Sequence, residues 1–355
     1  MAKVLMKGNE AIAEAAIQAG CKYFFGYPIT PQNEIPAYMA KKLPQIGGTF
    51  LQAESEVAAI NMVYGAAGTG ARVMTSSSGP GISLKQEGIS YIAGADLPCV
   101  IVNIVRSGPG LGGIQPAQSD YFQTVKGGGH GDYYMVVYAP ATIQEAVDVT
   151  MEAFDVADQY RTPVTILGDG MLGQMMEPVE FKQPKKRTLE EKSWATTGYI
   201  GDRPRNIINS LYIVPSMLED TIRKRFERYE VIKKEETKVE VYNCEDAQII
   251  IAAYGTTSRI CRSVIEAAEE IGIKVGLIRP ITVWPFPDQA FEEYANKDAV
   301  KAFLAVEMSM GQMVEDVRLA VNGRKPVHFT GRTGGMVPTP KEILDKIKII
   351  LEEVN

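Results

Sequence analysis

The run Cys99-Val-Ile-Val-Asn-Ile-Val105 decides the fold class. It is short, almost wholly apolar and rich in β-branched residues, which is typical of a strand buried on both faces of a sheet. Three further runs share this texture, at Arg72–Ser76, Tyr134–Tyr138 and Pro163–Leu167. An amphipathic helical pattern over Thr142–Gln159 separates the last two. Short apolar strands alternating with helices predict a parallel sheet that is covered by helices on both faces.

The same alternation extends along the chain in both directions. Before these strands, Asn9–Ala19 and Glu56–Gly65 predict helices, and Tyr23–Tyr27 predicts a strand. A second alternating series begins at Ala247 and continues to a final amphipathic helix over Pro340–Val354. We therefore expect an α/β protein with two doubly wound units, each built on a mainly parallel sheet.

The region between the two units differs in composition. From about Pro178 to Asp246 the chain is rich in Lys, Glu and Pro, and Ser216-Met-Leu-Glu219 matches a capping box before a densely charged helix. This helix is either a solvated surface element or a contact for a partner. The predicted organisation is a first domain over 1–178, a connecting segment with a surface helix over 179–245, and a second domain over 246–355.

Charge and hydropathy exclude several classes of protein. The net charge of −6 and the lack of a basic cluster give no reason to expect a nucleic-acid partner. The longest apolar stretches, such as Leu97–Val105, are too short for a membrane span, and the first residues lack the apolar core of a signal peptide. We expect a cytoplasmic protein that binds neither nucleic acid nor membrane.

The counts of Cys and His limit the chemistry. The chain holds four cysteines without a CxxC pair, and two histidines: Cys21, Cys99, Cys244, Cys261, His130 and His328. Neither an iron–sulfur cluster nor a zinc site is expected within this chain, and a Ser–His–Asp triad is disfavoured. Any reaction here is therefore expected to depend on a cofactor.

One glycine pattern imitates a dinucleotide site. Gly108, Gly110 and Gly113 satisfy GxGxxG directly after a strand. However, Pro109 lies inside the pattern, and Gln115-Pro116 interrupts the helix that would hold a pyrophosphate. The pattern predicts a loop, and a nicotinamide-dependent dehydrogenase is only a third hypothesis.

A second pattern imitates a thiamine-diphosphate motif. Gly168-Asp169-Gly170 matches the start of the GDG…N motif, in which an Asn on the order of 25 residues later completes the Mg²⁺ shell. The stretch Ser193–Thr197 contains no Asn. We therefore interpret Asp169 as a turn residue at a strand end and expect no metal ligand in this chain.

Four places in the first domain carry polar residues that suit a ligand site. Thr30 follows a strand, although it could also cap a helix with proline at the first position. Glu54 and Glu56 lie at a helix start, where acids also complement the helix dipole. Gly79 lies in a turn that permits close backbone approach, and Arg106 ends an apolar strand, where it needs an anion or a nearby Asp.

Together these segments resemble the pyrimidine-binding domain of thiamine-diphosphate enzymes, and most closely the alpha subunits of 2-oxo acid:ferredoxin oxidoreductases. The segments that carry the resemblance are Tyr27-Pro-Ile-Thr30-Pro, Glu54-Ser-Glu56-Val-Ala-Ala with Gly65, Thr75-Ser-Ser-Ser-Gly79-Pro-Gly81, Pro98-Cys-Val-Ile-Val-Asn-Ile-Val-Arg106 and Gln118-Ser-Asp120.

The second unit extends this resemblance over nearly the whole chain. Pro285-Phe-Pro287 and Glu307-Met-Ser-Met-Gly311-Gln312 resemble the transketolase-C-terminal-like domain of the family. The segment Gly331-Arg-Thr-Gly-Gly-Met-Val-Pro-Thr-Pro340 favours the branch that acts on branched-chain substrates such as 3-methyl-2-oxobutanoate.

The resemblance implies a role for each matching residue. Glu56 is the carboxyl group that hydrogen-bonds the cofactor's pyrimidine and so activates it, with Glu54 as the alternative. Gly79 and Pro80 also contact the cofactor, while Thr30 and Arg106 bind the 2-oxo acid. The guanidinium of Arg106 suits a substrate carboxylate through paired, charge-assisted hydrogen bonds.

The resemblance also implies partners. Thiamine diphosphate is shared with a beta subunit that holds the diphosphate and Mg²⁺, and gamma and ferredoxin-like delta subunits supply the rest, including the [4Fe-4S] clusters. The reaction is a CoA-dependent oxidative decarboxylation that passes electrons to ferredoxin. Two alternatives remain: the 2-oxoglutarate branch of the same family, and a non-catalytic scaffold subunit of such a complex.

Overall fold

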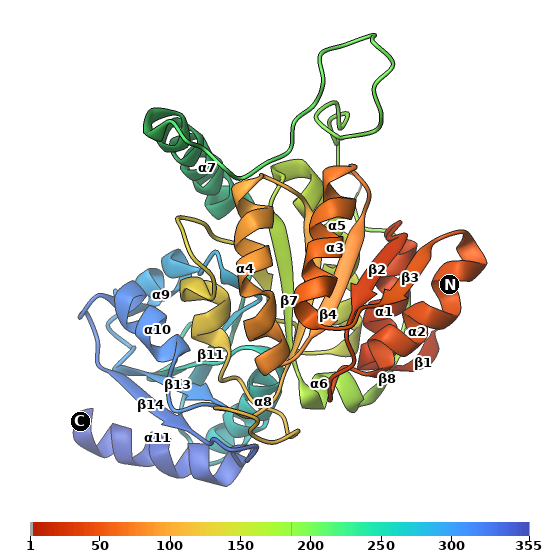
Figure 1. The fold of residues 1–355 in the computed structure, drawn as a ribbon. Coiled ribbons are helices and arrows are strands. Elements are labelled where there is room, and N and C mark those ends of the chain that lie inside the picture. Colours follow the sequence, from red (N-terminus) through yellow and green to blue (C-terminus); the bar gives the residue numbers. More distant parts are fainter. Residues whose placement is uncertain (1–2, 186, 355) are drawn as a thin grey trace.

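The computed structural model describes residues 3–185 and 187–354. In these residues the strands form a seven-stranded, a five-stranded and a two-stranded sheet, and helices flank the two larger ones (Figure 1). The predicted class of two mainly parallel α/β units is confirmed. No helix of the described residues is long and apolar enough to cross a membrane.

The seven-stranded sheet forms the core of the first unit. Its strands, in spatial order, are β12 (Thr282–Trp284), β6 (Val136–Tyr138), β7 (Pro163–Asp169), β5 (Cys99–Val105), β4 (Val73–Ser77), β2 (Tyr23–Gly26) and β3 (Thr49–Gln52). All neighbours pair in parallel except β12 and β6. Every residue of β4, β5 and β7 is buried, because helices cover both faces of the sheet.

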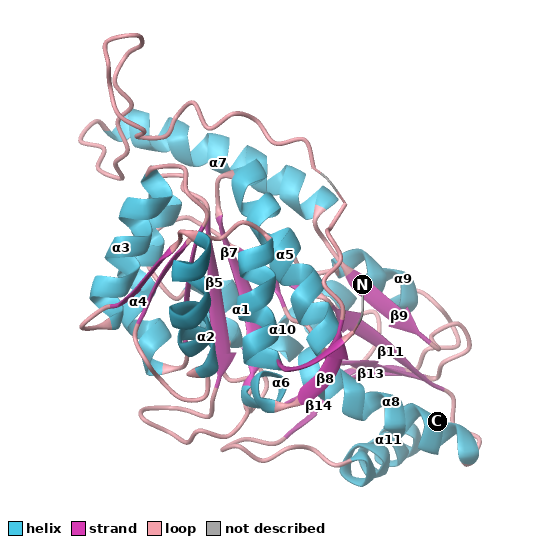
Figure 2. Cartoon of the chain, turned by 90° about the vertical axis from the view of Figure 1, so that its right-hand side faces the viewer, coloured by secondary structure: helices cyan, strands magenta, loops and turns pink. Residues whose placement is uncertain are grey.

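Two groups of helices cover this sheet. On one side, α3 (Glu56–Gly68) packs against α4 (Pro80–Gly94). On the other side, α1 (Gly8–Gln18) packs against both α2 (Glu34–Lys42) and α5 (Ile143–Tyr160), and Figure 2 shows the strands between the two groups. Shorter elements complete the unit: β1 (Val4–Lys7), β8 (Met176–Val179), α6 (Gly170–Gln174), a 3₁₀ turn at Leu43–Ile46 and a π-helical turn at Gln123–Gly127.

The five-stranded sheet forms the second unit. Its spatial order is β14 (Val327–Gly331), β13 (Ala302–Glu307), β10 (Ile249–Ala252), β11 (Val275–Pro280) and β9 (Val239–Tyr242), and only β9 is antiparallel to its neighbour. Here α8 (Gly255–Glu270) packs against α11 (Pro340–Val354), and α9 (Asp288–Ala295) packs against α10 (Met313–Val321).

The two units are closely joined. Strand β12 follows the five-stranded sheet's β11 in sequence, yet it pairs with β6 of the seven-stranded sheet. Side chains also cross between the units: Arg279 forms an ion pair with Glu145, and Gln118 donates a hydrogen bond to the Tyr254 carbonyl. The proposed domain limits at 178 and 245 therefore separate two units that remain in contact. One strand of the second unit, β12, belongs to the sheet of the first, and polar side chains bond across the interface.

The connecting segment projects from the first unit as an extended loop and then forms α7 (Pro215–Glu235) (Figure 1). The expected capping box is wrong: the helix begins at Pro215 without a side-chain cap, so Ser216 already lies in the first turn. Proline at the first helical position has the required backbone angle and lacks an N–H that would need a partner. On its inner face, Arg225 donates to Asp96 at 2.9 Å.

Candidate functional site

The predicted site residues meet at the carboxyl edge of the seven-stranded sheet. Parallel strands end at one edge, so the segments after β2, β3, β4 and β5 lie side by side there. Arg106 Nη1 donates to the Thr30 carbonyl at 3.1 Å. A Cβ atom placed on Gly79 would lie 3.5 Å from Arg106 Nε. A Cβ atom placed on Gly81 would lie 2.7 Å from Glu56 Oε1, which brings the helix start into the same cluster.

The two candidate carboxylates differ in exposure. Glu54 is exposed, whereas Glu56 is 7% exposed and is the first residue of α3. Ser55 caps this helix, because its hydroxyl accepts a hydrogen bond from the Ala58 amide at 3.2 Å. This cap turns the next side chain inward, and Glu56 reaches the start of α4 at Gly81. The buried position favours Glu56 over Glu54 as a group that contacts a ligand inside the fold.

The turn after β4 requires glycine at two positions. Gly79 has φ 44° and ψ −114°, a left-handed backbone that favours glycine, and Pro80 then opens α4. At Gly81 a Cβ atom would lie 2.2 Å from Ser77 Oγ as well as against Glu56. The absent side chains let the backbone of this turn come close to the carboxylate and to anything bound beside it.

Arg106 follows β5 and is 9% exposed. Besides Thr30, it donates from Nη2 to the Leu111 carbonyl at 3.0 Å, so its hydrogen-bond partners are neutral carbonyls. Burial raises the pKa of the Asp120 carboxyl, and Asp120 is near enough that the charge of Arg106 opposes this rise. In the described residues Arg106 Nε, although buried, has no hydrogen-bond partner. A buried guanidinium with a free donor is suited to an anion that binds from outside the chain.

Thr30 itself is exposed, and its hydroxyl accepts from Asn33 Nδ2 at 3.2 Å. The alternative reading of Thr30 as a helix cap is wrong, because α2 begins only at Glu34 with Asn33 as its N-cap. The Thr30 side chain is therefore free to face a small molecule at the edge of the sheet.

Several further polar atoms at this edge are buried and unpaired. Within residues 3–185 and 187–354, Ser77 Oγ, Ser78 Oγ and Asn103 Oδ1 have no hydrogen-bond partner. Buried polar groups in folded proteins are nearly always paired, and each exception calls for an explanation such as a missing ligand. Ser77 Oγ and the Glu56 carboxyl group both lie against Gly81, and Arg106 Nε lies near Gly79. Unpaired polar atoms therefore share this edge with Glu56, and the edge fits a polar ligand such as a cofactor.

Two buried residues of this cluster were not predicted. Lys85 of α4 is fully buried, and its Nζ donates to Thr75 Oγ1 at 2.7 Å and to the Ser76 carbonyl at 2.9 Å. Burial lowers the pKa of Lys85 to about 7, against the opposing attraction of Glu56. Gln32 accepts a hydrogen bond from the Ser76 hydroxyl. A signal for Lys85 was present, because it lies on the same helical face as apolar Ile82 and Ile89.

The two motifs that resemble cofactor-binding sequences, Gly168-Asp169-Gly170 and the GxGxxG pattern from Gly108, have structural roles. Asp169 caps α6, accepting from the Met171 and Leu172 amides at 2.8 and 3.1 Å and from the Thr256 hydroxyl. Burial raises the pKa of this carboxyl. The glycine pattern from Gly108 forms a loop with no helix after it, as predicted. In the part of the chain that the structure describes, no three His, Cys, Asp or Glu side chains gather as a metal site.

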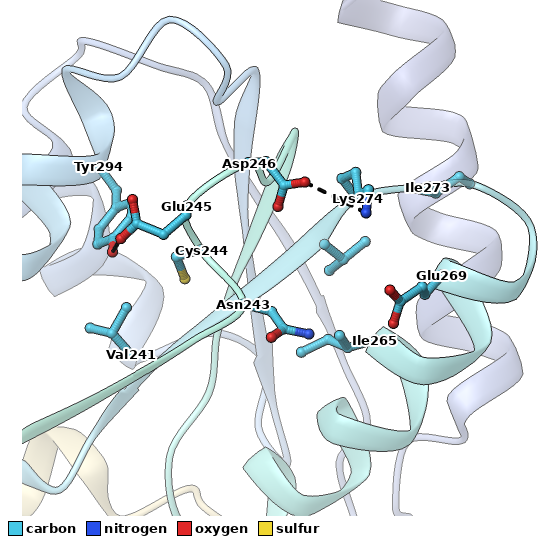
Figure 3. A pocket seen from close by; sticks show the side chains of 11 residues that line it. Val241, Asn243, Cys244, Glu245, Asp246, Ile265, Glu269, Ile273, Lys274 and Tyr294 are labelled. Atoms are coloured by element: carbon cyan, nitrogen blue, oxygen red, sulfur yellow. Dashed lines mark hydrogen bonds and ion pairs between the residues drawn. The ribbon is translucent and has the colours of Figure 1, made fainter.

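A cavity of about 360 Å³ lies elsewhere, in the second unit between the end of β9 and α8 (Figure 3). Three of its charged side chains have partners: Lys274 pairs with Asp246 at 3.5 Å, and Glu245 pairs with Lys297 at 3.1 Å. None of the predicted site residues lines it. No residue with a buried, unpaired polar atom among the described residues lines this cavity, whereas Ser77, Ser78, Asn103 and Arg106 lie at the edge of the other sheet.

Two family models match the chain, one in each unit. Residues 14–240 match the family described as "Pyruvate flavodoxin/ferredoxin oxidoreductase, thiamine diP-bdg". Residues 247–343 match "Pyruvate:ferredoxin oxidoreductase core domain II". The first match contains all the predicted site residues.

Curated relatives and a solved structure are similar over almost the whole chain. Ketoisovalerate oxidoreductase subunit VorB of Methanothermobacter marburgensis is 48% identical over 355 residues, 100% of both chains. 2-Oxoglutarate synthase subunit KorA of Methanothermobacter thermautotrophicus is 35% identical over 96% of this chain and 97% of its own. The 2-oxoglutarate:ferredoxin oxidoreductase of Magnetococcus marinus, solved with 2-oxoglutarate, coenzyme A and succinyl-CoA bound, matches with a TM-score of 0.86 and 26% identity. That match covers 98% of this chain, which spans 65% of the solved one.

Proposed function

The chain belongs to the 2-oxo acid:ferredoxin oxidoreductases, and we propose that it is the subunit that activates thiamine diphosphate for the decarboxylation of branched-chain 2-oxo acids. The reaction converts 3-methyl-2-oxobutanoate and CoA to the acyl-CoA and CO₂, and passes electrons singly to ferredoxin. The observation that carries the proposal is that the buried Glu56 shares one sheet edge with Ser77 Oγ, Ser78 Oγ and Arg106 Nε, which are buried and unpaired in the described residues. The relative named for ketoisovalerate is 48% identical and that named for 2-oxoglutarate 35%, which supports the branched-chain substrate.

Each residue of the edge has a chemical task. Thiamine diphosphate, when bound, supplies the nucleophile and the electron sink for loss of CO₂. Glu56 holds a proton on its carboxyl group for the pyrimidine ring, in a buried place from which water is largely excluded. Arg106 binds the carboxylate of the 2-oxo acid through its free Nε, and Thr30 donates its hydroxyl to the same substrate. Gly79 and Pro80 let the backbone approach the cofactor closely.

We also propose that this chain provides only half of the cofactor site. The oxygens of Asp169 cap α6 and bind the Thr256 hydroxyl, so this carboxylate is already engaged within the fold. The diphosphate and Mg²⁺ are therefore assigned to a beta subunit. The four cysteines are buried, and burial raises the pKa of Cys99 to about 12 and of Cys244 to about 11. Such thiols are poor cluster ligands, and the [4Fe-4S] clusters are assigned to a ferredoxin-like delta subunit.

The surface around α3 supports the existence of partner subunits. After Glu56 this helix has no charged residue, and Val57, Asn61 and Gly65 form an exposed row along it. The extended segment 206–213 crosses the far ends of α3 and α4, where Ile208 lies 3.8 Å from a Cβ atom placed on Gly68.

Along this segment alternate residues face outward. Ile207, Leu211 and Ile213 are 79%, 74% and 85% exposed, while the intervening residues are partly buried. Large apolar side chains in such a row are typical of a protein interface. We assign this surface to the companion subunits, which we propose include beta, gamma and delta chains in the cytoplasm.

A variant with Ile207, Leu211 and Ile213 all replaced by Ser tests that surface. We expect it to stay folded and to lose co-purification with the companion subunits. Leu319→Ser is the matched control, since Leu319 is 69% exposed on α10 in the second unit. Normal assembly of the triple variant would contradict the assignment.

Titration calorimetry with thiamine diphosphate and Mg²⁺ tests the half-site. We expect tight binding to the chain only when it is co-expressed with its companion subunits. Tight binding to the chain alone would show that it binds the diphosphate itself.

A substrate series with the assembled complex then separates the two branches, because the second carboxylate of 2-oxoglutarate needs an additional cation in the pocket. Full activity in a Glu56→Gln complex would favour the scaffold alternative.

A further inference from the structure

The buried Lys85 has no part in the site as described so far. Its side chain is fully enclosed and touches the end of β4, where its ammonium donates to the Thr75 hydroxyl and the Ser76 carbonyl. Neither partner is charged. An ammonium buried with only neutral partners is costly, since desolvation opposes its charge.

Lys85 and Glu56 lie on facing surfaces of α4 and α3. Gly81 and Lys85 are four residues apart, so they share one face of α4. Gly81 is the residue against which the Glu56 carboxylate lies, and a Cβ atom at Gly88, on the same side, would lie 2.5 Å from Ile60 of α3. Lys85 is therefore between two points where the helices touch, one turn from Glu56.

The charges between α3 and α4 come from the same two side chains, Lys85 and Glu56. Among the described residues, Glu56 is the charged group whose attraction acts on Lys85, while β4 contributes the uncharged Thr75, Ser76 and Ser77. An ammonium has three N–H donors, and two of them have partners in the described structure. The third remains for Glu56 or for a molecule bound beside it.

We propose that Lys85 is a positioning residue that acts through Glu56, providing the counter-charge when Glu56 gives up its proton. This inference rests on the proposed function, in which Glu56 serves the cofactor. The proton leaves the Glu56 carboxyl for the pyrimidine nitrogen, a carboxylate remains, and Lys85 keeps all of its own protons. No carbon bond forms or breaks, and nothing is oxidised or reduced in this step. The ammonium stabilises the carboxylate and so favours the transfer.

Three variants of the assembled complex test the role. Lys85→Met keeps the size of the side chain and removes the charge, and we expect kcat to fall about tenfold to a hundredfold while KM for the 2-oxo acid changes little. Lys85→Arg keeps a charge that does not titrate and should recover much of kcat. Lys192→Met is the control, since Lys192 donates to the Gly70 carbonyl and pairs with Asp158 at 2.5 Å, and its loss should leave kcat unchanged.

The pH profile separates this role from a purely structural one. In the unmodified complex kcat should decline on the basic side as Lys85 loses its proton. Lys85→Arg should move that decline to higher pH, and Lys85→Met should abolish it. Reduced activity of Lys85→Met with an unchanged profile, or a profile of Lys85→Arg equal to the unmodified one, would overturn the proposal.

A measurement without cofactor checks the buried charge itself. The pKa of Lys85 is lowered from 10.5 to about 7 in the folded chain. Between these values the unfolded chain binds more protons, so the free energy of unfolding should rise with pH over this window. Lys85→Met should remove that rise from the full-length chain. If the free energy of unfolding of Lys85→Met still rose with pH over this window, the rise would not come from Lys85, and its lowered pKa would be refuted. Full activity of Glu56→Gln would instead refute the proposed function, while the slope measured in the chain with the native Glu56 still tests the buried charge of Lys85 by itself.

Discussion

Each of the two large sheets ends in a buried carboxylate, but the two edges differ in how their polar groups are satisfied. In the second unit, Glu307 at the end of β13 accepts from the backbone amides of Met313 and Val314 at 3.0 Å and from the Ser309 hydroxyl at 2.9 Å. At the first edge, Glu56 lies near the Ser77 hydroxyl, and this hydroxyl, the Ser78 hydroxyl and Arg106 Nε have no partner in the described residues.

The comparison teaches which buried carboxylate is available for chemistry. Burial raises the pKa of Glu307, but its oxygens are used to begin α10. Such a group holds the fold together, because removing it leaves buried amides unpaired. At the edge near Glu56, buried polar atoms lack hydrogen-bond partners within the described residues. This is expected where a bound ligand supplies the missing hydrogen bonds. Burial alone would not distinguish the two.

The largest contrast is expected from Glu56→Gln and Glu307→Gln. In the assembled complex, Glu56→Gln should lower kcat about a hundredfold or more, because the amide cannot hold the proton. It should leave the urea midpoint of the chain nearly unchanged. Glu307→Gln should instead lower the free energy of unfolding by about 1–3 kcal/mol, since amide N–H groups replace one acceptor. The comparison fails if the two variants show the same pattern.

A similar contrast is expected between two buried arginines. Arg106→Lys should raise KM for the 2-oxo acid about tenfold, because lysine lacks the guanidinium fork that binds a carboxylate. Arg279 uses its guanidinium on Glu145 and Glu240. We expect Arg279→Lys to reduce thermal stability without changing KM, as measured by steady-state kinetics and calorimetric unfolding. An unchanged KM in Arg106→Lys would remove this residue from the substrate site.

Each edge also has a glycine against its carboxylate residue. At Gly81 a Cβ atom would meet Ser77 Oγ at 2.2 Å, and at Gly331 it would meet the Glu307 carbonyl at 2.7 Å. Gly81→Ala should displace Glu56 and lower cofactor affinity in calorimetry. Gly331→Ala should cost stability by about 1–3 kcal/mol through overpacking, with cofactor affinity retained.

The smallest effects are expected at two hydroxyls. Thr30→Val should raise KM for the 2-oxo acid a few-fold, corresponding to one hydrogen bond of about 1 kcal/mol. Ser309→Ala removes the donor to Glu307 and should reduce stability by about 1 kcal/mol without a change in KM. Equal KM for Thr30→Val and the unmodified complex would indicate that this hydroxyl faces solvent during the reaction.

The sequence by itself determined the fold class and most elements, because their periodicity is local. The apolar run at Cys99–Val105 is the buried strand β5, and the GxGxxG pattern from Gly108 is a loop. The resemblance of short segments selected Thr30, Glu56 and Arg106, and the place of Thr30 after a predicted strand put it at the carboxyl edge of the sheet. The capping box at Ser216 failed because Pro215 competes for the first helical position.

Tertiary structure decided the features that depend on distant partners. The pairing of β12 with β6 joins segments more than a hundred residues apart, and no local pattern specifies it. Lys85 is a surface residue by type, and only the packing of α4 on β4 and α3 encloses it beside Glu56. The unpaired atoms of Ser77 and Arg106 likewise become visible only when every possible partner has been placed. Periodicity reports which face of an element is buried, whereas the completeness of hydrogen bonding depends on the whole fold.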